Sequence, residues 1–91
     1  MVWTIEYTDT AKHQLKKLDK QIARRILDYM DERIIGSGNP HGAGKLLMGM
    51  LGGLWRYCVE DYRVICDIQN KNLRILVLKL GNRREVYREK H

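Results

Sequence analysis

The first third of the chain changes from an alternating to a helical pattern of apolar residues. Residues 2–7 alternate in character and are rich in β-branched and aromatic side chains, which predicts a strand. Thr8, Asp9 and Thr10 then offer oxygens that can cap a first helix, and Asp19 offers one for a second. We expect an antiparallel helical hairpin that bends around Asp19. Its core-facing stripes would be Ala11, Leu15 and Leu18, then Ile22, Ile26, Tyr29, Met30 and Ile34.

A glycine-rich segment separates these helices from a β-rich C-terminal half. Residues 36–40 include two glycines and a proline, which end a helix, and we expect a loop from there to Gly53. Two β-like runs, 55–59 and 62–68, are separated by only two residues, which is typical of a tight hairpin. After a second turn, the nearly continuous apolar run at 73–80 predicts a central strand, and a charged tail follows.

These elements predict one α+β domain over residues 1–91. The expected order is β-α-α-β-β-β plus the tail, with the helical hairpin packed on one face of a mainly antiparallel four-stranded sheet. A chain of this length can bury one modest core. No apolar run reaches the roughly 20 residues of a membrane span, and the first residues do not resemble a secretion signal. We therefore expect a cytoplasmic protein.

The net charge is +6, from 17 lysines and arginines against 11 acidic residues. This excess favours an anionic partner, and charge alone leaves open whether it is nucleic acid, an acidic protein or a membrane surface. The two cysteines, Cys58 and Cys66, form no CxxC pair and have no histidines at metal-ligand spacing. We therefore expect reduced thiols and no metal site.

The predicted hairpin sorts its side chains onto two faces. If Glu60 and Asp61 form the turn, Cys58 lies opposite Arg63 and Arg56 lies opposite Ile65. Two arginines on neighbouring strands repel each other unless an anion bridges them or water screens them. An anion site and an ordinary solvated face both remain open. The core-facing set would be Trp55, Tyr57, Val59, Tyr62, Val64 and Cys66, and the opposite set Arg56, Cys58 and Arg63.

Basic residues also recur every four positions in the helical region. If the helix ran on without a bend, they would form a cationic ridge able to follow a phosphate backbone. A solvated helix face is the alternative interpretation. The residues of this pattern are Lys12, Lys16, Lys20 and Arg24, with Lys17 and Arg25 nearby.

Four segments form a combined pattern: Trp55-Arg56-Tyr57, Asp61 to Ile65, Leu80 to Arg88 and Leu15 to Lys20. Together they resemble the RelE toxin family. The resemblance covers nearly the whole chain, and the predicted order of elements agrees with the fold of the RelE and ParE superfamily. It implies a toxin of a type II toxin–antitoxin system that cleaves messenger RNA in the ribosomal A site. In that reaction the ribose 2′-hydroxyl attacks the adjacent phosphate, and no metal or other cofactor is implied.

The resemblance also implies roles for individual residues. Arg63 would hold the phosphate with Arg83 as its partner, Arg56 would contact the substrate or the transition state, and Tyr87 would stack on a base or assist proton transfer. Arginine stays protonated in proteins, so these arginines would stabilise charge rather than act as bases. Ion pairs with acidic neighbours, and a packed position for Tyr87, are the alternatives. RNA contacts are expected from Lys12, Lys16, Lys17, Lys20, Arg24, Lys45 and Arg84.

The chain departs from the family pattern at three positions. Cys58 stands where related chains usually carry a basic residue, Asn82 where many have histidine, and Glu60 at a turn position often filled by glycine. Cysteine supplies no cation, so we expect a weakened toxin. A Cys58 thiolate acting as base, or Lys45 reaching in from the loop, could offset the loss. The histidines, His13, His41 and His91, lie away from the expected site.

The family resemblance implies two partners, a RelB-like antitoxin protein and the ribosome. The basic residues between Arg83 and His91 would attract an acidic antitoxin. DNA would be contacted only through the antitoxin, and no membrane contact is expected. Two other functions stay open: a ParE-like toxin that inhibits gyrase, and a catalytically weak module that binds an antitoxin and acts as a co-repressor.

Overall fold

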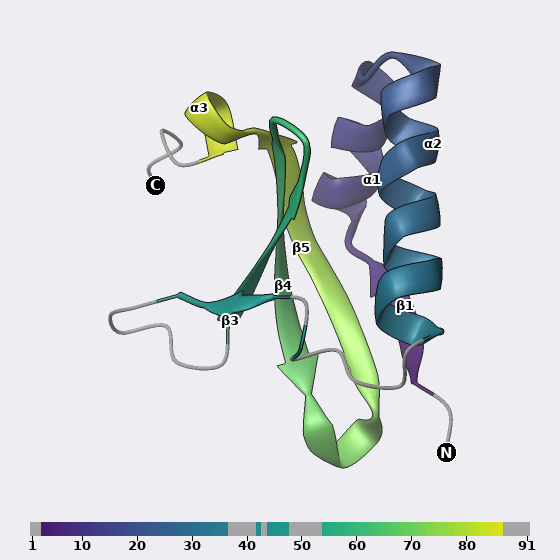
Figure 1. Ribbon diagram of the computed structural model, residues 1–91, viewed down its shortest axis with the longest axis vertical. Helices are drawn as coiled ribbons and strands as arrows, with labels where there is room; N and C mark the ends of the chain where they lie inside the picture. The colour runs from purple at the N-terminus through teal and green to yellow at the C-terminus, as the bar shows by residue number, and fades with distance from the viewer. Residues whose placement is uncertain (1–2, 37–41, 43, 48–53, 87–91) are drawn as a thin grey trace.

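The computed structural model describes residues 3–36, 42, 44–47 and 54–86 (Figure 1). The helices are α1 (Asp9–Lys17), α2 (Lys20–Tyr29), the π-helical segment η1 (Met30–Ile35), the 3-10 turn η2 (Asn70–Asn72) and α3 (Arg83–Val86). The strands are β1 (Thr4–Tyr7), β2 (Lys45–Leu46), β3 (Leu54–Val59), β4 (Tyr62–Gln69) and β5 (Arg74–Asn82). Within the described residues, no helix is long and apolar enough to span a membrane.

The strands form one mixed five-stranded sheet in the order β1-β5-β4-β3-β2. The pair β1–β5 is parallel and the other pairs are antiparallel. In Figure 1, α1 and α2 lie together on one side of this sheet, which confirms the expected α+β class. The expectation of four strands was wrong, because Lys45–Leu46 pairs with Arg56 and Trp55 and adds β2 where a loop was predicted. A two-residue strand has no alternation of its own, so only its pairing reveals it.

The helical hairpin begins and bends where its caps predict. The Thr8 hydroxyl accepts a hydrogen bond from the Ala11 N–H at 3.1 Å, and the Asp19 carboxylate accepts one from the Gln21 N–H at 3.1 Å. Each cap satisfies a backbone donor that the first helical turn leaves free. Leu18 between the helices has an extended backbone (φ −78°, ψ 156°), which stops α1 before α2 starts.

The core lies between this hairpin and one face of the sheet. Both predicted sets of core-facing residues are confirmed, since each member is buried or packs against the buried cluster. The predicted register of β3 with β4 is also confirmed, with Cys58 opposite Arg63 and Arg56 opposite Ile65. The fully buried members include Ala11, Ile26, Met30, Ile34, Tyr57, Val64, Cys66, Ile75 and Val77.

A β-bulge interrupts the pairing of β4 with β5. Cys66 pairs with Val77, but Ile65 pairs with Lys79, so Leu78 is an extra residue on β5. Because side chains alternate along a strand, one extra residue exchanges the faces of all residues beyond it. Lys79 therefore lies on the face turned away from α1 and α2, which we call the open face.

The start of α1 holds β5 in place at this bulge. The Thr8 N–H donates to the Val77 carbonyl at 3.0 Å, and the Thr8 hydroxyl donates to the Leu78 carbonyl at 2.8 Å. Two residues further along β5, the Leu80 N–H donates to the Gln14 side-chain oxygen at 2.7 Å. Backbone groups of β5 thus find partners in α1 after β1 has ended. The hydrogen bonds of β5 with Thr8 and Gln14 therefore stabilise the bulge as part of the fold.

Candidate functional site

The open face gathers basic side chains from β2, β3, β4 and β5 in two cross-strand rows. These rows follow from the pairing partners, because residues directly opposite each other share a face. One row is Cys58–Arg63–Gly81, and the next is Lys45–Arg56–Ile65–Lys79. We call Arg56, Arg63 and Lys79 the cation cluster.

Gly81 leaves open space beside Arg63, and we call this space the hollow. The two residues are direct partners on β4 and β5, and a Cβ added to Gly81 would meet no atom within 4 Å. A bulky group can therefore approach the sheet backbone next to the Arg63 guanidinium.

The backbone of the hairpin turn fixes the Arg63 guanidinium. Its Nη1 donates to the Glu60 and Tyr62 carbonyls, each at 3.1 Å. Glu60 adopts a positive φ of 56°, a conformation that glycine tolerates better, and this shapes the turn. Within the described residues Arg63 forms no ion pair, although Asp61 and Asp67 lie nearby in sequence. The remaining N–H groups of the guanidinium can serve an anion.

An apolar side chain lies among these cations. Ile65 is only 3% exposed, yet it belongs to the open face and not to the main core cluster. Arg56 and Lys79 flank it in the same row, and the Nε atom of Arg56 is buried. Their aliphatic stems can cover Ile65, and both side chains are partly buried. A partly desolvated cation attracts phosphate more strongly than one surrounded by water.

Arg83 and Arg84 follow the end of β5. The Arg83 N–H donates to the Asp61 carbonyl at 2.8 Å, which holds the start of α3 against the β3–β4 turn. The Asn82 side-chain oxygen accepts from the Arg84 N–H at 3.0 Å, so this amide serves the backbone. Both arginine side chains are exposed, and Arg83 comes two residues after Gly81. The predicted Tyr87 lies outside the described residues.

The helical basic residues do not form the single ridge that their spacing suggested. The bend at Leu18 separates Lys12 and Lys16 on α1 from Lys20 and Arg24 on α2, although all four are exposed. Two arginines of α2 pair with carboxylates: Arg24 with Asp28 at 3.7 Å and Arg25 with Glu60 at 2.7 Å. Exposed pairs of this kind contribute little to stability.

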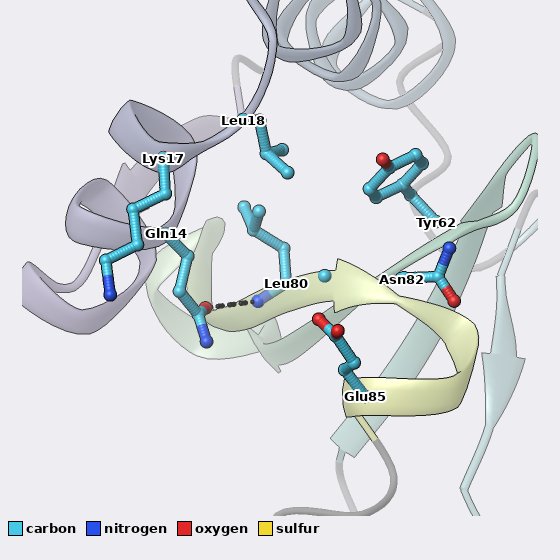
Figure 2. Close-up of a pocket in the computed structure, with 8 residues that line it drawn as sticks. Gln14, Lys17, Leu18, Tyr62, Leu80, Asn82 and Glu85 are labelled. Carbon is cyan, nitrogen blue, oxygen red and sulfur yellow. Dashed lines mark hydrogen bonds between the residues drawn. The ribbon is translucent and has the colours of Figure 1, made fainter.

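Two clefts border the site. The first, about 410 Å³, is lined by Lys17 from α1, Tyr62 from β4 and Glu85 from α3, which lie on different sides of it in Figure 2. The second, about 370 Å³, lies between α2 and the outer edge of β3, and Cys58 contributes to its lining. Neither cleft contains a member of the cation cluster in its lining. The cation cluster therefore lies outside both clefts, on the open face.

The two cysteines lie on opposite faces of the sheet and are not bonded to each other. Cys66 is buried in the core, and burial raises the pKa of its thiol, so it stays protonated at neutral pH. Cys58 is exposed on the open face beside Arg63. Burial likewise raises the pKa of the Tyr7 and Tyr57 hydroxyls, so they stay protonated at neutral pH.

Lys79 is the site residue that the sequence pattern did not reveal. Strict alternation along residues 73–80 would place Lys79 with Ile75 and Val77 on the core face. Only the bulge moves it to the open face. The available signal was the one charged residue inside the apolar stretch 75–80.

Comparisons with known proteins agree in family and fold. The family model described as the ParE toxin of the type II toxin–antitoxin system, parDE, matches residues 5–87. Toxin RelG of Mycobacterium tuberculosis is 26% identical over 88 residues (97% of this chain, 99% of that protein). Toxin RelE of the same organism is 30% identical over 84 residues (92% and 84%).

Two solved structures show the same fold. A chain in the crystal structure of the toxin–antitoxin complex RelBE2 from Mycobacterium tuberculosis superposes with a TM-score of 0.81 at 24% identity, covering 93% of this chain and 95% of that chain. The isolated Escherichia coli RelE toxin superposes with a TM-score of 0.72 at 19% identity, covering 93% and 90%.

Proposed function

This chain belongs to the ParE toxin family of type II toxin–antitoxin systems, and from that premise we propose that it cleaves messenger RNA in the ribosomal A site. The observation that supports this choice is the cation cluster on the open face, with Gly81 leaving space beside Arg63. Arginine and lysine side chains around a hollow suit a phosphodiester. The cation cluster has no feature that specifically favours binding to gyrase.

The proposed reaction forms a bond from the ribose 2′-oxygen to phosphorus and breaks the bond from phosphorus to the 5′-oxygen. A base accepts the 2′-hydroxyl proton, and the leaving oxygen gains a proton. Arg63, Arg56 and Arg83 would stabilise the charge that develops on the phosphorane. Tyr87 would stack on a base or assist proton transfer. The products are a 2′,3′-cyclic phosphate, which water can then hydrolyse to a 3′ phosphate, and a free 5′-hydroxyl.

We expect cleavage to depend on the ribosome. The arginines of the site stay protonated and cannot accept the 2′-hydroxyl proton. Because the site offers no evident good base, the substrate must be held in an attack geometry by a larger scaffold. The test compares translated mRNA with the same mRNA free of ribosomes, and adds a gyrase supercoiling assay. Cleavage only on ribosomes is expected. Equal cutting of naked RNA would contradict ribosome dependence, and gyrase inhibition without cleavage would favour the ParE-like function.

We also propose a RelB-like antitoxin as the protein partner, with DNA contacted only through it. We expect the toxin and the antitoxin to meet in the cytoplasm, where translating ribosomes are found. Because the tail carries Arg84 and further basic residues, removing residues 84–91 should weaken antitoxin binding by roughly tenfold, and added salt should weaken it further. Calorimetric titration measures both effects, with Lys71→Met as a control outside the tail. Affinity unchanged by truncation and by salt would show that the antitoxin binds elsewhere.

A further inference from the structure

Lys79 has a position around Arg63 that complements that of Arg56. Arg63 lies directly opposite Gly81 on β5, and Lys79 is two residues before Gly81 on the same face. On the other side, Arg56 occupies the matching diagonal position on β3. Diagonal neighbours in an antiparallel sheet have Cβ atoms about 7–8 Å apart, within reach of long side chains. Arg63 is thus flanked by one cation on each neighbouring strand.

The direct partners of Arg63 contribute no positive charge. The Cys58 thiol on β3 has no cationic form, and Gly81 on β5 has no side chain. On the two neighbouring strands, a phosphate held by Arg63 over the Gly81 hollow would therefore meet further positive charge from the diagonal positions, in addition to that of Arg83 beyond the end of β5. On the β5 side, within the described part of the strand, Lys79 is the basic residue of the open face beside that hollow.

From this geometry we propose that Lys79 contacts the reacting phosphate together with Arg63, and supplies transition-state charge that the Cys58 position lacks. The inference rests on the proposed nuclease function. An ammonium group on a flexible stem can follow phosphate oxygens as their geometry changes during attack. Lys79 is the direct partner of the buried Ile65, so its stem can lie along that side chain, and its length lets the ammonium group reach the neighbouring Gly81 position.

The first test replaces Lys79 with methionine, which keeps an unbranched stem over Ile65 but removes the charge. We expect the cleavage rate on saturating programmed ribosomes to fall about 10²-fold, with Lys79→Arg restoring it to within about tenfold of the parent. Lys71→Met removes the same charge from the exposed turn η2 at the opposite end of β5 and serves as the matched control. Thermal unfolding confirms that each variant is folded.

A second test asks whether Lys79 supplies the charge that the Cys58 position lacks. In a Cys58→Arg background, a new cation lies directly opposite Arg63, so the Lys79→Met loss should shrink to about tenfold or less. The same loss in both backgrounds would overturn this compensation. A Lys79→Met variant that is folded and changes only the ribosome concentration for half-maximal rate would overturn the transition-state role. A parent protein that never cleaves mRNA would instead refute the proposed function.

Discussion

Arg63→Gln should slow ribosome-dependent cleavage about 10²–10³-fold, the loss expected when one preorganised donor to the developing charge is removed. The turn carbonyls of Glu60 and Tyr62 hold this guanidinium in place through Nη1, so its other N–H groups are ready for the phosphate. Glutamine is shorter and neutral and cannot supply that contact. Arg63→Lys keeps the charge but loses the planar fork, so we expect an intermediate rate.

The matched control for Arg63 is another arginine of the open face. Arg74 on β5 lies at the opposite end of the sheet, where it pairs with Glu6 at 3.2 Å and with Gln69 at 2.9 Å. Arg74→Gln removes the same charge and should leave the cleavage rate unchanged. Single-turnover rates on programmed ribosomes measure both variants. If a folded Arg63→Gln protein cleaves as fast as Arg74→Gln, Arg63 does not hold the phosphate.

Cys58→Arg should increase cleavage by about 10- to 100-fold, because a charge-assisted hydrogen bond to the transition state is worth roughly 1.5–3 kcal/mol. Cys58 is exposed directly opposite Arg63, so an arginine there can point into the site without disturbing the core. The chain with cysteine would then be an attenuated toxin. Growth arrest on expression and single-turnover cleavage both measure the gain.

Cys58→Ser separates attenuation from an active role of the thiol. Serine is neutral and close in size, so the attenuation hypothesis predicts the parental rate for this variant. A thiolate base would be lost in Cys58→Ser and in Cys58→Arg alike. A large loss of cleavage in both variants would therefore assign the base to Cys58 and contradict the prediction of a gain.

Local sequence signals were sufficient to predict the helical hairpin and the β3–β4 register. Thr8 and Asp19 are capping residues whose oxygens bind nearby N–H groups, so their effect can be predicted from sequence. The turn at Glu60 and Asp61 fixes the pairing of the strands beside it. The faces of β3 and β4, and with them Arg56 and Arg63, follow from that register.

Two of the errors, the missed β2 and the missed bulge, have a common physical cause, because they depend on partners distant in sequence. The short β2 exists through its pairing with β3, and the bulge at Leu78 is held by Thr8, 70 residues earlier in the chain. Neither leaves a pattern in its own segment, so Lys79 could not be placed on the open face. The cationic ridge assumed an unbroken helix, and the extended Leu18 prevents it.

Toeprinting of ribosomes halted at a defined codon tests the central claim most directly. The purified protein is added to initiated ribosomes on one mRNA, and the new RNA ends are mapped by primer extension and by their susceptibility to phosphorylation. The proposed function predicts a cut within the A-site codon that leaves a free 5′-hydroxyl, and no cut when ribosomes are omitted. Intact mRNA in the A site at protein concentrations that arrest growth would contradict it.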